Sequence, residues 1–95
     1  MTGTSISSAG LDARRRKILF RSWHRGMREV DLILGAFADN EIDRLSDEEL
    51  TVYEAFMAEQ DADILKWVIG ETPVPEHHDT PVFARILSYR EAPLG

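Results

Sequence analysis

The chain has 95 residues, of which 43% are hydrophobic and 29% charged, and its formal net charge at pH 7 is −6. Such a composition is typical of one small soluble globular domain, which at this length buries only about 60–65% of the surface exposed by the unfolded chain. A sequence without cysteine excludes disulfides, thiolate metal sites and cysteine nucleophiles, and it fits a reducing compartment such as the bacterial cytoplasm.

The charged residues are unevenly distributed along the chain. Residues 11–30 contain seven basic and two acidic residues, whereas residues 31–63 contain eleven acidic residues and one arginine. A chain of this kind can present a basic face to a partner while it stays acidic overall.

The two ends of the chain differ in character from the part between them. The Ser/Thr/Gly-rich residues 1–10 lack the apolar core of a secretory signal and are predicted to be a disordered lead-in. A single helical domain is then expected over residues 11–92. No apolar run approaches the roughly 18–20 residues that span a bilayer, so no membrane contact is expected.

The first two predicted helices meet at a glycine. Apolar residues recur at helical spacing over residues 11–25, and Gly26 follows where a helix end favours a residue able to take a positive φ. A second amphipathic helix begins near Met27. The sequence leaves open whether this helix breaks at residues 39–40 or continues to Leu45.

The next helices have clear start and stop signals. Ser46 is followed three residues later by Glu49, which is the pattern of a capping box and predicts a helix from here to about Asp61. A fourth, shorter helix is predicted over residues 62–69, ending at Gly70.

A Pro-rich connector, "ETPVPEHHD", precedes the last predicted helix. This helix opens with Thr80 as N-cap and Pro81 at the first helical position. No stretch alternates convincingly with a period of two residues, and the sequence contains no repeats. The predicted fold class is therefore all-α, a single-domain bundle of about five short helices.

Candidate chemical sites are few. His77 and His78 are adjacent, and neighbouring histidine side chains point apart on most backbones, whereas a catalytic zinc site needs three well-placed protein ligands. We therefore expect a solvated loop and no metal site. Gly-rich phosphate loops, nucleophile elbows and HExxH motifs do not occur. The sequence predicts no catalytic residue and thus no enzyme.

The basic run "RRRK" at residues 14–17 raises the possibility of nucleic-acid binding. The strongly acidic segment after it would repel phosphates, and aromatic residues suited to base stacking are few. We expect no nucleic-acid partner. The alternative function is nevertheless a small nucleic-acid-binding or antitoxin-type regulator that uses residues 14–21 as a basic arm.

Residues 23–31, "WHRGMREVD", form the remaining candidate site. Arg21, Arg25 and Arg28 lie three or four residues apart and could share one helix face, as a docking patch would require. A simple helix end followed by Glu29 in the first turn of the next helix explains the same residues without a function. Physical reasoning from the residues leaves both interpretations open.

The segment resembles the RGxxE motif of the SdhE family of succinate dehydrogenase assembly factors, also called flavinators. Its five residues here are Arg25, Gly26, Met27, Arg28 and Glu29. The similarity continues through "EVDLILGAF", "DRLSDEEL" and "DADILKWVIG" and covers about residues 14–90. His24, where relatives often carry another basic residue, and the ten-residue lead-in depart from the family pattern without touching the motif.

The resemblance implies a five-helix bundle that binds the flavoprotein subunit of succinate dehydrogenase, with fumarate reductase as a second candidate client. It implies a monomeric maturation factor, or chaperone, that promotes covalent attachment of FAD to a histidine of the client. FAD would then be the cofactor of the client, with no cofactor bound stably by this chain. Whether this chain contacts FAD stays open.

The resemblance also implies roles for individual residues. Gly26 would allow close approach of the partner's backbone, and Arg25 and Glu29 would make polar contacts with it. Arg21 and Arg28 are partner-binding candidates by proximity alone.

Overall fold

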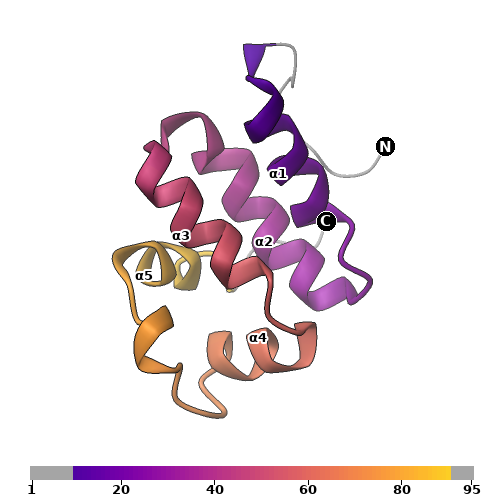
Figure 1. Cartoon of the computed structure of the whole chain (residues 1–95). Coiled ribbons are helices and arrows are strands. Elements are labelled where there is room, and N and C mark those ends of the chain that lie inside the picture. Colours follow the sequence, from indigo (N-terminus) through magenta and orange to yellow (C-terminus); the bar gives the residue numbers. More distant parts are fainter. Residues whose placement is uncertain (1–9, 91–95) are drawn as a thin grey trace.

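The computed structural model describes residues 10–90, which contain five α-helices and no strand (Figure 1). The helices are α1 (Ala13–Trp23), α2 (Arg28–Glu41), α3 (Asp47–Met57), α4 (Asp61–Val68) and α5 (Pro81–Leu87), with short 3-10 helices at Ile42–Arg44 and Glu76–His78. The prediction of an all-α bundle of about five helices is confirmed. Apart from Gly10, the predicted lead-in lies outside the described residues, as does the predicted domain end at residue 92.

The start of α1 and the turn that follows it are set by local chemistry. The carboxylate of Asp12, the N-cap residue, accepts a hydrogen bond of 2.8 Å from the backbone N–H of Arg15. The helix ends at Trp23, two residues earlier than the sequence predicts. Gly26 has a φ of 108°, so the predicted positive φ at this glycine is confirmed.

The sequence left open whether the second helix breaks at residues 39–40, and in the structure α2 does not break there. It continues through them to Glu41 and then tightens into the 3-10 helix Ile42–Arg44. The predicted capping box of α3 is confirmed, since the Ser46 hydroxyl accepts from the Glu49 N–H at 3.1 Å and the Glu49 carboxylate accepts from the Ser46 N–H at 2.9 Å.

The predicted end of the third helix is wrong by four residues. The helix ends at Met57, and Asp61 instead opens α4, where its negative charge complements the positive end of the helix dipole. The last helix begins as predicted. Thr80 is its N-cap and accepts a hydrogen bond of 3.1 Å from the N–H of Phe83, and a proline occupies the first helical position.

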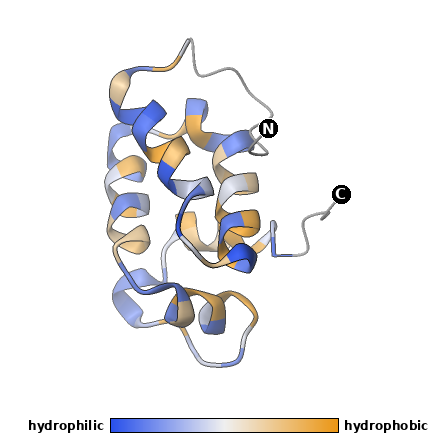
Figure 2. Ribbon diagram, turned by 90° about the vertical axis from the view of Figure 1, so that its right-hand side faces the viewer, coloured by the Kyte–Doolittle hydropathy of each residue, from blue (hydrophilic) through white to orange (hydrophobic). Residues whose placement is uncertain are grey.

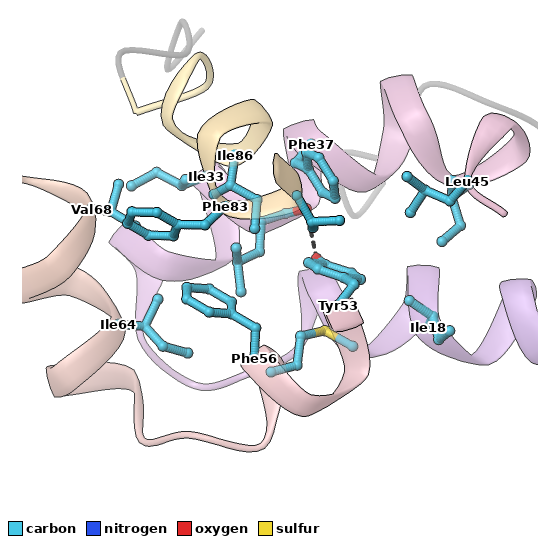
Figure 3. Close-up of a cluster of buried hydrophobic side chains, with 14 of the residues drawn as sticks. Ile18, Ile33, Phe37, Leu45, Tyr53, Phe56, Ile64, Val68, Phe83 and Ile86 are labelled. Carbon is cyan, nitrogen blue, oxygen red and sulfur yellow. Dashed lines mark hydrogen bonds between the residues drawn. The ribbon is translucent and has the colours of Figure 1, made fainter. Parts of the chain in front are cut away.

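Helix α2 lies at the centre of the bundle, because it packs against α1, α4 and α5 (Figure 1). All five helices contribute to one buried cluster, from Ile18 of α1 to Ile86 of α5 (Figure 3). The rings of Phe37 and Tyr53 are 4.9 Å apart within it. Figure 2 shows hydrophobic and hydrophilic turns alternating along the helical ribbons, as expected of helices with one buried face.

A small polar network crosses this core. The hydroxyl groups of Ser22 and Tyr53 lie 2.7 Å apart, and the Tyr53 hydroxyl donates to the carbonyl of Leu34 at 3.3 Å. Burial raises the pKa of Tyr53, so the phenol stays neutral. Among the described residues, no buried side-chain nitrogen or oxygen lacks a hydrogen-bond partner.

The two N-terminal helices approach each other closely at a glycine. A Cβ atom added to Gly35 would lie 2.3 Å from Cδ2 of Trp23, so the indole ring occupies the space that any larger residue would need. The Trp23 indole N–H also donates to the carboxylate of Asp39 at 3.2 Å. This contact fixes α1 against α2 immediately before the turn at Gly26.

Candidate docking site

The five residues of the segment "RGMRE" form the junction between α1 and α2. Arg25, Gly26 and Met27 lie in the turn, whereas Arg28 and Glu29 occupy the first turn of α2. The helix-junction interpretation of the sequence is therefore geometrically correct. Any docking function must be carried by residues that the junction leaves exposed.

The guanidinium of Arg25 points into the molecule. Its Nε donates to the carboxylate of Asp61 at 2.5 Å, its Nη1 to the carbonyl of Met57 at 2.6 Å and its Nη2 to the carbonyl of Glu59 at 2.8 Å. The Arg25 side chain is only 12% exposed and that of Asp61 19%. Arg25 thus ties the α1–α2 turn to the end of α3 and the start of α4.

The backbone of the same residue is also held. The N–H of Arg25 donates to the carboxylate of Asp31 in α2 at 2.8 Å. An arginine with these four hydrogen bonds stabilises the turn and fixes the position of the residues that follow it. The sequence gives no local sign of this role, because the partner carboxylate of Asp61 lies 36 positions away.

Gly26, Arg28 and Glu29 are exposed, and beside them the surface is hollowed. One hollow of about 240 Å³ is lined by Arg28, Glu29, Leu32, Ile33, Leu65, Ile69 and Arg90. A second, more open hollow of about 370 Å³ is lined by Trp23, Gly26, Arg28, Asp31 and Leu32. The two hollows share Arg28 and Leu32 and therefore adjoin. We call their lining residues the docking surface.

The docking surface combines an apolar floor with a charged rim. Leu32 and Leu65 are half-buried and Ile69 is 56% exposed, so three aliphatic side chains of one hollow are accessible together. Arg28 and Glu29 place opposite charges at the edge of this floor. An apolar centre with a polar rim is the common arrangement of protein–protein interfaces.

Sequence reasoning did not identify the apolar residues of this surface. Leu32, Leu65 and Ile69 sit at helical spacing among core residues, so the periodicity alone places them inside. The one available signal was the position of Ile69 immediately before Gly70, where α4 has already ended and a side chain is easily exposed.

Arg21, the remaining predicted site residue, is exposed on α1 but lines neither hollow. Its neighbour Phe20 is 63% exposed and stacks on the ring of His24, with centroids 3.9 Å apart. Arg21 therefore belongs to a separate face of α1.

The arginines of the basic run at residues 14–17 are engaged within the chain. Arg14 donates to the carboxylate of Glu54 at 2.6 Å and to the hydroxyl of Thr51 at 3.0 Å. Arg15 binds Asp12 and the carbonyls of Ile42 and Leu45, and Arg16 donates to the carbonyl of Leu11. Among these contacts, the Arg14–Glu54 ion pair joins the basic N-terminal segment to the acidic segment after it.

The structure corrects the expectation of a solvated loop for His78 but not for His77, whose side chain is 70% exposed. His78 is only 5% exposed, and its ring packs edge-on against Phe56 at 5.5 Å and beside Trp67 at 5.7 Å. The rings of His77 and His78 are 4.1 Å apart rather than pointing in opposite directions. The 3-10 helix Glu76–His78 brings them together, and that short element was not predicted.

The histidine pair faces a carboxylate. His78 Nε2 lies 2.6 Å from Glu59 Oε2, and His77 Nε2 lies 3.8 Å from the same oxygen. The hydrogen bond with His78 lowers the pKa of Glu59, whereas partial desolvation raises it. The hydrogen bond has the larger effect, so the pKa of Glu59 lies below its ordinary value.

No helix in residues 10–90 combines the length and the apolar character needed to cross a membrane.

Comparison with known proteins gives a consistent family. Residues 16–90 match the family model described as flavinator of succinate dehydrogenase. The FAD assembly factor SdhE of Acetobacter pasteurianus is 34% identical over 86 residues, which cover 90% of this chain and 79% of that protein. No solved structure gives a significant match.

Two similar eukaryotic proteins are longer. The mitochondrial succinate dehydrogenase assembly factor 2 of Dictyostelium discoideum is 35% identical over 86 residues, covering 90% of this chain and 61% of that protein. Its counterpart in Schizosaccharomyces japonicus is 40% identical over 63 residues, covering 66% of this chain and 44% of that protein. The chain therefore spans less than two thirds of the length of either.

Proposed function

Since the chain belongs to the family of flavinators of succinate dehydrogenase, we propose that it binds the flavoprotein subunit of that enzyme through the docking surface. Binding promotes the covalent attachment of FAD to the subunit. The protein is an assembly factor and not a catalytic enzyme. The observation that carries the proposal is the apolar hollow beside Arg28 and Glu29, whose floor includes the 56% exposed Ile69.

The contribution of this chain is positional. A flavin supplies its own reactive groups, so a protein that assists its attachment needs to orient the partner and adjust its electrostatics. An assembly factor that binds one arrangement of the client more tightly than others raises the population of that arrangement. FAD remains the cofactor of the client in this mechanism, and this chain holds no cofactor of its own.

Each residue of the junction has a distinct task in this mechanism. Arg28 and Glu29 make the polar contacts with the client at the rim of the hollow. Gly26 lets the client's backbone approach the turn, because it is exposed and nothing lies within 4 Å of the position a Cβ would take. Arg25 contributes mainly by holding the turn, and Arg21, which lies on a separate face of α1 outside both hollows, is only a secondary contact candidate.

The alternative function as a nucleic-acid-binding regulator has no support from the geometry. Arg14, Arg15 and Arg16 donate hydrogen bonds to groups of the chain itself. In the segment 14–21, Lys17 and Arg21 are the two exposed basic residues for which the structure gives no such hydrogen bond. A duplex-binding surface needs several phosphate contacts. We therefore assign no nucleic-acid partner.

Three further points belong to the same proposal. The protein acts as a monomer, because the docking surface is reserved for the client. It acts in the bacterial cytoplasm, in keeping with its similarity to a bacterial assembly factor. Fumarate reductase is a second candidate client.

Reconstitution with a client tests the proposal. The flavoprotein subunit is incubated with FAD and each variant as the sole assembly factor, and covalent flavin is read from the fluorescence of the denatured client on a gel. Glu29→Ala and Ile69→Ser should each reduce flavinylation while leaving the melting temperature unchanged. Glu48→Ala, at an exposed acidic position of α3, is the matched control and should have no effect. Full flavinylation by both surface variants would refute the proposed docking surface.

A further inference from the structure

Glu59, His77 and His78 place one potential ligand atom each within 4.8 Å of one another. The carboxylate comes from the turn after α3, and the two imidazoles come from consecutive positions of the 3-10 helix Glu76–His78. Nearly twenty residues of chain separate the two contributions. The cluster is therefore a product of the fold and not of a local sequence motif.

We propose that Glu59, His77 and His78 form a binding site for a divalent transition-metal ion, with Zn²⁺ as the ion of first choice. Two imidazole nitrogens and one carboxylate oxygen match the ligand types that Zn²⁺ accepts, and three protein ligands leave a fourth position for water. Affinity at such a site rises further for Cu²⁺, which makes that ion a convenient probe.

One of the three ligands is already held in place, and a second is anchored through its backbone. The ring of His78 is buried between Phe56 and Trp67, so its Nε2 points in a fixed direction towards the carboxylate. The backbone carbonyl of Glu59 accepts a hydrogen bond of 2.8 Å from Nη2 of Arg25, which anchors this residue from its other side. Ligands positioned before the ion arrives reduce the entropic cost of binding.

The third ligand provides access. The side chain of His77 is 70% exposed, so an ion can reach the site from solvent and keep a water molecule. Glu76 and Asp79 are exposed on either side of the histidine pair and add negative charge that favours a cation.

The ligand atoms need only small movements to bind an ion. Zn²⁺ holds its ligands at about 2.0–2.2 Å, which places them roughly 3.3 Å apart in tetrahedral geometry. The distance from His78 Nε2 to Glu59 Oε2 would widen from 2.6 Å, and that from His77 Nε2 would shorten from 3.8 Å. The carboxylate, which is 36% exposed, can make both adjustments. The ion then replaces the proton between Glu59 and His78, which passes to the solvent.

Zinc titration of the metal-free full chain tests the site. A competing chromophoric chelator reports a 1:1 complex, expected with micromolar affinity. His77→Ala and Glu59→Gln should each weaken binding by at least about 10-fold, a loss that even the removal of outer-shell partners produces at metal sites. His24→Ala removes an exposed histidine at the C-cap of α1 and is the matched control, with no expected change.

Copper quenching locates the site independently. Trp67 lies 5.7 Å from the His78 ring, so Cu²⁺ should quench its emission, whereas the Trp67→Phe variant, which keeps Trp23, should show little quenching. Zinc should also raise the melting temperature of the wild-type chain but not that of Glu59→Gln. Absence of zinc binding, or equal affinity in the wild type, His77→Ala and Glu59→Gln, would overturn the proposal.

Discussion

Replacement of Arg25 by alanine tests the most specific structural assignment of the junction. The guanidinium contacts one carboxylate and two carbonyls, and its side chain is 12% exposed. The variant would leave the Asp61 carboxylate and the carbonyls of Met57 and Glu59 without this donor. Water can reach Asp61 in part, because its side chain is 19% exposed.

The expected loss follows from these contacts. Breaking a buried ion pair by removing one partner lowers the free energy of unfolding by about 3–5 kcal/mol. Because water has partial access to Asp61, we expect a loss near the lower end of this range, about 3 kcal/mol. The whole domain is stabilised by only about 5–15 kcal/mol. For a domain of this size the melting temperature should fall by roughly 12–24 °C.

Thermal unfolding followed by circular dichroism measures the effect, with Arg28→Ala as the matched control. Arg28 is exposed at the rim of the hollow, so its removal should change the free energy of unfolding by no more than about 0.5 kcal/mol. Arg25→Lys should fall between the two, because an ammonium keeps the charge but lacks the planar fork that reaches three acceptors. Equal melting temperatures for Arg25→Ala and Arg28→Ala would refute the inward role of Arg25.

Two further predictions concern packing and pH. Gly35→Ala should lower the melting temperature by roughly 5 °C or more, because the added Cβ would lie 2.3 Å from the Trp23 ring. Crowding of this kind costs about 1–3 kcal/mol of folding free energy. An unchanged melting temperature would show that the ring moves freely. Burial acts to raise the pKa of Glu41, but hydrogen bonds from Tyr89 and Arg85 outweigh it and hold this pKa below its ordinary value. The stabilisation by Glu41 is therefore complete above a pH of about 4.5 and is lost as the pH falls through its lowered pKa. Urea unfolding across this pH range should show a smaller pH dependence for Glu41→Gln than for the wild type; identical pH dependence would contradict the assignment.

The sequence predicted the features that depend on near neighbours. The Ser46–Glu49 capping box, the Thr80 N-cap and the positive φ at Gly26 each arise from a few consecutive residues, so their patterns can be read directly. The number and type of helices followed from hydrophobic periodicity for the same reason. The end of α3 was misplaced because residues 58–61, "AEQD", contain no glycine or proline that would mark a helix end before Asp61 opens the next helix.

The features that were missed depend on contacts between distant parts of the chain. The hydrogen bond between Arg25 and Asp61 spans 36 positions, and that between His78 and Glu59 spans 19. In each case the sequence shows ordinary charged or polar residues that also suit a solvated surface. The exposure of Ile69 is of a similar kind, since apart from its position before Gly70 it depends on how α2 and α4 are arranged.

Under the proposed function, the junction between α1 and α2 joins stability and docking in five consecutive residues. Arg25 points inward to Asp61, whereas Arg28 lies exposed three residues later, and the turn at Gly26 with its φ of 108° separates these two directions. A side chain at position 26 would favour a different φ and so would shift the rim of the docking surface and the anchor of Arg25 together. Reduced flavinylation by an Arg25 or Gly26 variant therefore reports lost contact with the client only if the melting temperature is retained. Variants of Glu29 and Ile69 separate the two effects, because these residues line the hollow and do not anchor the turn.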